Sequence, residues 1–257
     1  MSSEIQPAVV LCLSGHDPSG GAGIQADIEA VAAQGCHAAT VITCLTLQDT
    51  RNVQELVPVE ADLFKRQVRL ISQDYSIAAI KIGLLGSPAM AHSVLEVLDE
   101  LKGQDSLIPV VLDPVLAAGG GAELAQRGMI AGIRQLLPHV TLLTPNRQEA
   151  RRLAAAEITA DAASDLLTAG CQAVLVTGAD EAEGNTVINQ LYQQHQERQW
   201  RYPKLTGRYH GSGCTLAASI AARLALGDPL QLALESAQAY TYQTLLQAIN
   251  PGQGQSI

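Results

Sequence analysis

The chain has 257 residues, of which 47% are hydrophobic, and its 25 acidic and 16 basic side chains leave a formal net charge of −9. This length suits one large α/β domain or two small ones, and the apolar content excludes a disordered chain. The acidic balance argues against nucleic-acid binding by phosphate neutralisation, which requires a basic surface. It leaves anionic substrates possible, because a local pocket can oppose the overall field.

Lysine and cysteine usage exclude several kinds of site. None of the four lysines follows a glycine, so the G-K-[ST] sequence of a Walker A loop is absent. The five cysteines are an odd number without C-x-x-C spacing, which argues against disulfides and zinc knuckles and favours buried thiols. No apolar stretch reaches the roughly 20 residues of a membrane span, and no basic leader precedes one. We therefore expect a reduced, soluble, cytoplasmic protein that contacts no membrane.

Apolar runs alternate with segments of helical period along the chain. Strands are predicted at 7–13, 38–45, 78–82, 108–112, 140–143 and 173–176, with an edge hairpin at 185–193 and 197–202. Helices are predicted at 23–34, 60–72, 88–102, 122–137, 147–156, 161–169, 214–226 and 230–249. This alternation predicts an α/β fold: one doubly wound, mostly parallel sheet flanked by helices, in a single domain over 1–257.

Ligands bind such sheets beyond the carboxyl ends of the strands. After the first strand, Gly21-x-Gly23-x-x-Ala26 imitates the dinucleotide fingerprint, but about seven loop residues separate it from Leu13, whereas the fingerprint begins directly after its strand. A loop that covers a ligand and runs into a helix N-terminus is favoured over a nicotinamide site. A flexible surface loop is the alternative.

Two acids follow neighbouring strands. Asp113 ends the fourth strand, and Glu149 lies shortly after the fifth. Two nearby carboxylates suit a hydrated Mg²⁺ that also binds phosphate oxygens. Both residues could instead be helix caps or turn formers. After the second strand, Gln48 offers an amide that can donate and accept hydrogen bonds.

The segment His210-Gly211-Ser212-Gly213-Cys214 precedes an apolar helix. Two glycines let the backbone curl so that successive N–H groups point at one spot, and the helix dipole adds positive potential. An anion site is the expected result. Cys214 falls in the first helical turn, where a thiol pKa can drop to about 3.5–7.5, which would suit a nucleophile or a base. A packed cysteine beside a glycine cap is the structural alternative.

Six segments together resemble the hydroxymethylpyrimidine/phosphomethylpyrimidine kinases of thiamine biosynthesis, in the ribokinase-like superfamily. They span nearly the whole chain in the family's order. The segments are SGHDPSGGAGIQADIEA (14–30), VITCLTLQDT (41–50), AIKIGLLG (79–86), VVLDPV (110–115), LLTPNRQEA (142–150) and HGSGCTLAASIAARLALG (210–227). A G-x-G-C turn, in place of the G-x-G-D of most sugar kinases, points to the pyrimidine and pyridoxine branch.

The resemblance implies ATP-dependent phosphorylation of 4-amino-5-hydroxymethyl-2-methylpyrimidine and then of its monophosphate, with ATP and Mg²⁺ bound and a homodimeric assembly. By position, Cys214 resembles the residue that accepts the hydroxymethyl proton. Gly211, Ser212, Gly213 and the Cys214 amide resemble the anion hole, and Asn146 lies beside the nucleotide phosphates.

The same correspondence implies the remaining ligands. Asp113 and Glu149 match the acidic positions that organise Mg²⁺. The residues that match the pyrimidine pocket are Gly15, Asp27, Gln48, Leu84 and Val115. Asp27 and Gln48 would hydrogen-bond the ring nitrogens and the amino group.

The chain departs from the family at three positions where the resemblance implies lysines that meet phosphate charge. Thr177, Ala118 and Gln238 occupy them. Either other cations substitute, or phosphoryl transfer is weakened, and the second transfer most. The candidate substitutes are Lys204, Arg208, His16 and His210.

Three other functions remain as alternatives. A pyridoxal or pyridoxine kinase would share the cysteine turn and a hydroxymethyl heteroaromatic substrate. A paralogue that binds a pyrimidine phosphate without catalysis would fit the missing lysines. A nicotinamide oxidoreductase is the most distant alternative.

Overall fold

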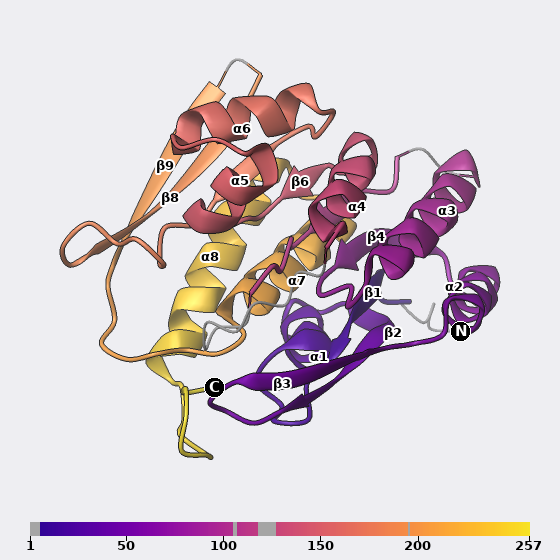
Figure 1. The fold of residues 1–257 in the computed structure, drawn as a ribbon, viewed down its shortest axis with the longest axis horizontal. Helices are drawn as coiled ribbons and strands as arrows, with labels where there is room; N and C mark the ends of the chain where they lie inside the picture. Colours follow the sequence, from indigo (N-terminus) through magenta and orange to yellow (C-terminus); the bar gives the residue numbers. More distant parts are fainter. Residues whose placement is uncertain (1–5, 105–106, 118–126, 195) are drawn as a thin grey trace, which may run out of the picture.

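The computed structural model describes residues 6–104, 107–117, 127–194 and 196–257. In these ranges one sheet has the strand order β3-β2-β1-β4-β5-β6-β7-β8-β9 (Figure 1). Its strands are β1 Val9–His16, β2 His37–Gln48, β3 Val53–Pro58, β4 Ile77–Ile82, β5 Val110–Leu112, β6 Leu142–Leu143, β7 Val174–Val176, β8 Thr186–Gln193 and β9 Gln196–Pro203. The helices are α1 Gly23–Ala33, α2 Ala61–Asp74, α3 Pro88–Gln104, α4 Met129–Leu136, α5 Arg147–Ala154, α6 Thr159–Thr168, α7 Ser212–Ala225, α8 Leu230–Leu246 and the short 3-10 helix η1 Leu137–His139.

The six central strands, from β2 to β7, are parallel, which confirms the predicted mostly parallel sheet. The predicted edge hairpin is also confirmed, because β8 pairs antiparallel with β7 and β9. In Figure 1, β3 and the β8–β9 hairpin lie at opposite ends of the sheet. Strands with helices on both faces form continuous apolar runs, and all but the last residue of β1 are accordingly buried.

Two apolar cores lie on opposite faces of this sheet. Leu11 and Leu13 of β1 pack into the core under α2 to α6, which includes Phe64. Val10 and Cys12 point the other way, into the core under α1, α7 and α8. Successive side chains of a strand point to opposite faces, so one short apolar run supplies both cores.

The strand order reverses direction at β1, which is hydrogen-bonded to β2 on one side and to β4 on the other. The connections therefore diverge between β1 and β4, and a crevice opens beyond the carboxyl ends of these strands. Helix α7 packs against β1, β4 and β5 there, which places its first turn beside the ends of all three strands.

Three local predictions were wrong or incomplete. The sequence indicated a loop after residue 45, but β2 continues to Gln48 and turns back into β3, an edge strand with mostly exposed side chains and hence little apolar signal. Helix α4 begins only at Met129, after Gly128 at a φ of +92°, and residues 122–126 of the predicted helix lie outside the described residues. Helix α7 begins two residues earlier than predicted, at Ser212.

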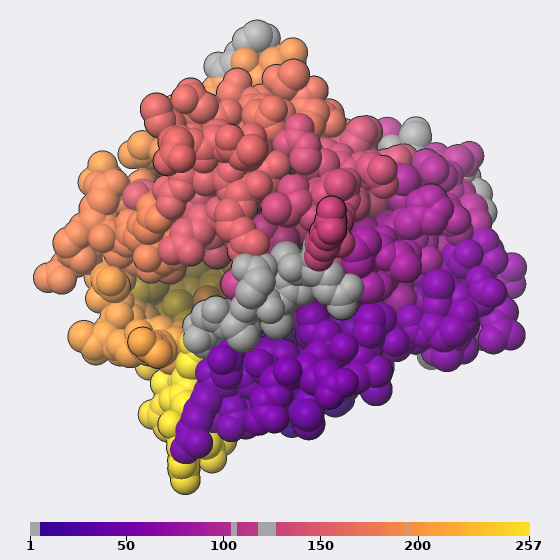
Figure 2. Space-filling model, in the orientation of Figure 1, coloured from indigo at the N-terminus to yellow at the C-terminus, as the bar shows by residue number. Residues whose placement is uncertain are grey.

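Residues 250–257 form a segment that the sequence did not assign. The Gln255 N–H donates to the Thr50 carbonyl at 2.8 Å, and the Ser256 carbonyl accepts from the His210 N–H at 2.8 Å. The C-terminal segment therefore joins the β2–β3 turn to the start of α7. Figure 2 shows it in yellow against the purple β2–β3 region. Among the described residues, no helix has the length and apolarity to cross a membrane.

Candidate active site

The first turn of α7 is the centre of the site. Gly211 precedes the helix at a φ of +80°, and a Cβ there would overlap the Gly21 carbonyl oxygen. The two glycine-rich segments therefore pack backbone against backbone, as only glycine permits. In the part of the chain that the structure describes, no side chain caps α7. The first N–H groups of a helix have no partner within the helix, so an anion at this turn stays a prediction.

Cys214 lies in this first turn and is half-buried. Burial raises the pKa of its thiol to about 12, despite the opposing charge of Lys81 and a hydrogen bond from the Gly23 backbone. The thiol pKa is therefore raised at a position where the sequence allowed a lowered one, because burial outweighs the charge of Lys81. Cys214 in turn lowers the pKa of the Asp113 carboxyl, against the larger effect of burial.

Behind the cysteine is a fully buried lysine that sequence reasoning missed. The Lys81 ammonium lies 2.7 Å from Asp27 Oδ1 and donates to Ser14 Oγ at 2.8 Å. Burial opposes its charge, but Asp27, Cys214 and Asp113 raise its pKa overall. A charged residue within the apolar run 77–82 was the signal available in the sequence, because lysines are rarely fully buried without a partner.

Asp113 and Glu149 are both buried and interact. Burial raises the pKa of Asp113 to about 6 and that of Glu149 to about 8, and the charge of Asp113 contributes to the second shift. Glu149 also forms a capping box with Asn146 at the start of α5, and its Oε1 accepts from the Leu116 N–H at 3.2 Å. The predicted helix-cap role is therefore present for Glu149.

The two carboxyls fit a Mg²⁺ that takes most of its ligands from water and phosphate. Hard cations bind oxygen, and Mg²⁺ commonly takes only one or two protein carboxylates. In the described part of the chain, no group of three or more His, Cys, Asp or Glu side chains could hold a metal alone. A cation would also relieve the repulsion that raises the pKa of Glu149.

The residues predicted for the pyrimidine pocket are only partly brought together. A Cβ on Gly15 would lie 3.2 Å from Leu84 Cδ2, so these two residues pack against each other. Val115 is half-buried on the loop after β5. Asp27 is fully buried in its pair with Lys81, and Gln48 stands apart at the end of β2, beside His210.

His210 joins two loops that the sequence left separate. Its Nε2 lies 2.8 Å from Asp17 Oδ2 and 3.2 Å from Gln48 Nε2. Burial opposes ionisation of Asp17, but hydrogen bonds from His210 and Ser19 lower its pKa overall. The sequence offered His210 as a substitute cation for phosphate, whereas in the structure its Nε2 is bound to the Asp17 carboxylate.

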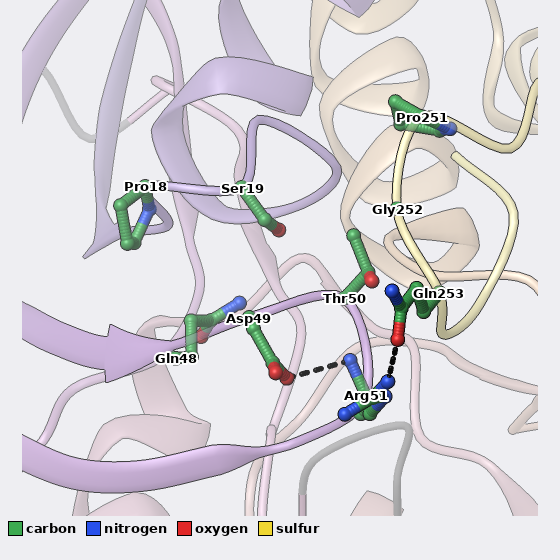
Figure 3. A pocket seen from close by; sticks show the side chains of 9 residues that line it. All are labelled: Pro18, Ser19, Gln48, Asp49, Thr50, Arg51, Pro251, Gly252 and Gln253. Atoms are coloured by element: carbon green, nitrogen blue, oxygen red, sulfur yellow. Dashed lines mark hydrogen bonds between the residues drawn. The ribbon is translucent and has the colours of Figure 1, made fainter.

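Gln48 also lines a cavity of about 460 Å³, drawn in Figure 3. The loop after β1, the β2–β3 turn and the C-terminal segment line this open cavity, and Arg51 and Gln253 at its border form a hydrogen bond. Its lining residues are Pro18, Ser19, Gln48, Asp49, Thr50, Arg51, Pro251, Gly252 and Gln253. The sequence gave no sign that residues 251–253 lie here.

The positions of the missing lysines differ in their surroundings. Gln238 is buried and accepts from Asn189 Nδ2 at 2.9 Å, and Asn189 Oδ1 accepts from the Gly178 N–H at 3.1 Å. Its amide thus fixes the turn after β7. Thr177 is half-buried, and Ala118 lies outside the described residues. Among the proposed substitutes, Lys204 and Arg208 are exposed.

Comparison with known proteins identifies similar chains. A family model described as "Phosphomethylpyrimidine kinase" matches residues 17–257. The hydroxymethylpyrimidine/phosphomethylpyrimidine kinase of Haemophilus influenzae is 32% identical over 255 residues, covering 95% of this chain and 93% of that protein.

Two solved structures share the fold. A Bacillus subtilis pyridoxal kinase in complex with ADP has a TM-score of 0.87 at 26% identity, covering 98% of this chain and 96% of that one. A phosphomethylpyrimidine kinase from Clostridium difficile has a TM-score of 0.79 at 26% identity, covering 93% and 99%. These likenesses confirm the predicted ribokinase-like fold.

Substitution of Gly211 by alanine tests the backbone contact with Gly21. We expect Gly211→Ala to lower the free energy of unfolding by roughly 2 kcal/mol or more, because left-handed strain and a clash with a carbonyl add together. Gly20→Ala is the matched control, since Gly20 has a φ of +84° but nothing within 4 Å. Urea denaturation measures the free energy of unfolding of both variants. Equal losses in the two would contradict a close backbone contact between Gly211 and Gly21.

The raised pKa of Glu149 predicts that stability falls with rising pH. The folded protein holds this proton more tightly than the unfolded chain, whose carboxyl has the ordinary pKa of 4.5. The stabilisation is complete below about pH 4.5 and is lost as the pH rises to about 8.

Glu149→Gln should therefore reduce the fall of the free energy of unfolding with pH. At pH 8 without metal, its free energy of unfolding should exceed that of the unsubstituted protein by about 2 kcal/mol. Urea denaturation from pH 5 to 9 with a chelator measures it, with the exposed Glu157→Gln as control. Parallel curves for the original and Glu149→Gln proteins would refute the buried charge.

Proposed function

The chain belongs to the phosphomethylpyrimidine kinase family, and we propose that it transfers the terminal phosphoryl group of ATP to hydroxymethylpyrimidine in thiamine biosynthesis. The acceptor is the hydroxymethyl group of 4-amino-5-hydroxymethyl-2-methylpyrimidine, followed by the phosphate of its monophosphate. The observation that carries the proposal is the uncapped first turn of α7 beside Asp113. A Cβ on Gly213 would lie 3.5 Å from Asp113 Oδ2, so anion-binding amides and a cation-binding carboxylate adjoin.

The backbone amides at Gly211, Ser212, Gly213 and Cys214 hold the phosphoryl oxygens as charge develops on them. Such preorganised donors are worth about 10²–10³ each in rate. Asp113 and Glu149 hold Mg²⁺, which neutralises the phosphate charge when it is bound.

Cys214 receives the proton of the attacking hydroxyl. Its raised thiol pKa means that the sulfur carries a proton at neutral pH, and this proton must leave before the sulfur can accept another. Cys214 is half-buried, so this proton can leave to solvent, and the charge of Lys81 favours the thiolate that results.

The pyrimidine ring lies against Gly15, Leu84 and Val115, and Gln48 and Asp27 hydrogen-bond its polar edge. Asp27 is enclosed and paired with Lys81, so its part requires that the pocket opens to the ring. Asn146, beside the acids, borders the nucleotide phosphates.

The second phosphoryl transfer is expected to be the slower one, because its acceptor brings more negative charge. Gln238 is neutral and engaged within the fold, and Thr177 is also neutral. The backbone turn of α7 must therefore carry more of the phosphate binding than in a protein with lysines there.

Incubation with ATP, Mg²⁺ and the pyrimidine, followed by mass analysis, tests the function. We expect ADP and the pyrimidine monophosphate, with the diphosphate forming more slowly. Thermal stabilisation by the pyrimidine without ADP would instead support a binding protein that lacks catalysis.

Cys214→Ala should lower kcat by at least about 10², the scale of a lost proton acceptor, with nucleotide binding nearly unchanged. Cys171→Ala, a buried thiol remote from the turn, is the control. Undiminished turnover in Cys214→Ala would remove the cysteine from the proton path.

Pyridoxal is the second candidate substrate, because the similar Bacillus subtilis structure is described as a pyridoxal kinase. Both substrates carry a hydroxymethyl group on a nitrogen heteroaromatic ring. The higher kcat/KM in parallel assays identifies the preferred one.

For the assembly we propose a homodimer of single-domain kinase chains in the cytoplasm. Five free cysteines fit a reducing compartment.

The proposed dimer interface is an apolar patch on the edge hairpin. Leu45 and Leu47 of β2 and Val57 of β3 are exposed, and Leu45 pairs with Val57 on one face of this hairpin. Such a patch favours an interface. Sedimentation should give a dimer that Leu47→Lys dissociates, and a monomeric original protein would refute it.

A further inference from the structure

The environment of His210 extends the proposed function to the choice of ligand. We propose that His210 is a positioning residue that fixes the direction of the Gln48 amide, so that its NH2 group faces the substrate and donates to a ring nitrogen. The inference rests on the proposed function, because it concerns the pyrimidine pocket of that site.

The proton on His210 Nε2 decides the geometry. This nitrogen lies 2.8 Å from the Asp17 carboxylate, which can only accept, so Nε2 carries a proton and donates it there. The Gln48 amide lies 3.2 Å from the same nitrogen. An N–H cannot bond to another donor, so a favourable contact forms only when Gln48 turns its oxygen toward His210.

The imidazole is held in place on several sides. A Cβ on Gly21 would lie 2.7 Å from His210 Cδ2, so the ring rests directly on that backbone. Asp17, 3% exposed, also accepts from the Ser19 N–H and Oγ at 2.8 and 2.7 Å and from the Ala22 N–H at 2.9 Å. A carboxylate bound four times cannot readily turn away, so Nε2 keeps its proton, and the Gln48 amide shares this N–H as a second and weaker acceptor.

The orientation of the Gln48 amide decides which ligand it can bind, because its oxygen only accepts and its NH2 group only donates. With the oxygen turned toward His210, Gln48 directs its NH2 group away from the imidazole, and the ring nitrogen of the pyrimidine would accept from it there. A donor selects an acceptor. The class of ligand that fits is a heteroaromatic ring with an unprotonated nitrogen, and a ring that presents N–H at that point would be rejected.

A double-mutant cycle tests whether His210 acts through Gln48. The variants are His210→Leu, Gln48→Ala and the pair, with His92→Leu as a control at an exposed histidine on α3. KM and kcat for the pyrimidine are measured at saturating ATP. Each single substitution should raise the pyrimidine KM about tenfold, the effect of roughly one lost hydrogen bond.

The pyrimidine KM of the double variant should be no higher than that of Gln48→Ala, because without the Gln48 amide His210 has no group to orient. His210→Gln, which keeps a side-chain N–H for Asp17 and the amide oxygen, should restore part of the affinity. If the two effects on KM multiply, so that the double variant has a KM near a hundredfold higher, the inference is overturned. The proposed kinase function is not affected by that result.

A further variant covers the case in which His210→Leu does not fold. Gln48→Glu can accept from His210 but cannot donate to a ring nitrogen, so it should fold and bind the pyrimidine at least tenfold less tightly. Undiminished affinity in Gln48→Glu would overturn the inference. Absence of pyrimidine turnover in the unsubstituted protein would overturn the proposed function and this inference with it.

Discussion

A positive charge enclosed within the fold underlies the whole candidate site. Lys81 stands on β4 and pairs with Asp27 of α1 at 2.7 Å, with both side chains fully buried. Removing one partner from such a pair leaves an uncompensated charge, which is strongly destabilising. The pair therefore ties α1 to the sheet at the point where the strand connections diverge. The charge of Lys81 also reaches the first turn of α7, where it lowers the pKa of the Cys214 thiol against the larger effect of burial.

The site nonetheless contains more buried acid than buried base. Burial raises the pKa of Asp27, Asp113 and Glu149, and Lys81 only partly offsets this for Asp27 and Asp113. Carboxyls in this condition bind positive charge readily, whereas the uncapped amides of α7 bind negative charge. A phosphate group that arrives with a divalent cation satisfies both demands at once. This complementarity explains why an acidic chain with few lysines suits a nucleotide substrate.

Close backbone contact sets the shape of the site. Gly21 and Gly211 touch through their main chains, and the Asp17–His210 hydrogen bond holds the same two loops together. The C-terminal segment reinforces them from outside through its hydrogen bond to His210. The first turn of α7, the loop of residues 17–22 and Gln48 are therefore linked to one another through Gly211 and His210.

The sequence by itself determined the alternation of strands and helices, the loops that follow the parallel strands and the glycine turn before α7. Apolar runs and glycine spacing are local signals, so neighbouring residues suffice to read them. The edge strand β3 was not predicted, because its side chains are mostly exposed and form little apolar pattern. Only the tertiary structure decided the partner of Lys81, the contact of His210 with Asp17 and Gln48, and the raised pKa of Cys214. These depend on distances between residues far apart in the chain and on the exclusion of water, which no local pattern records.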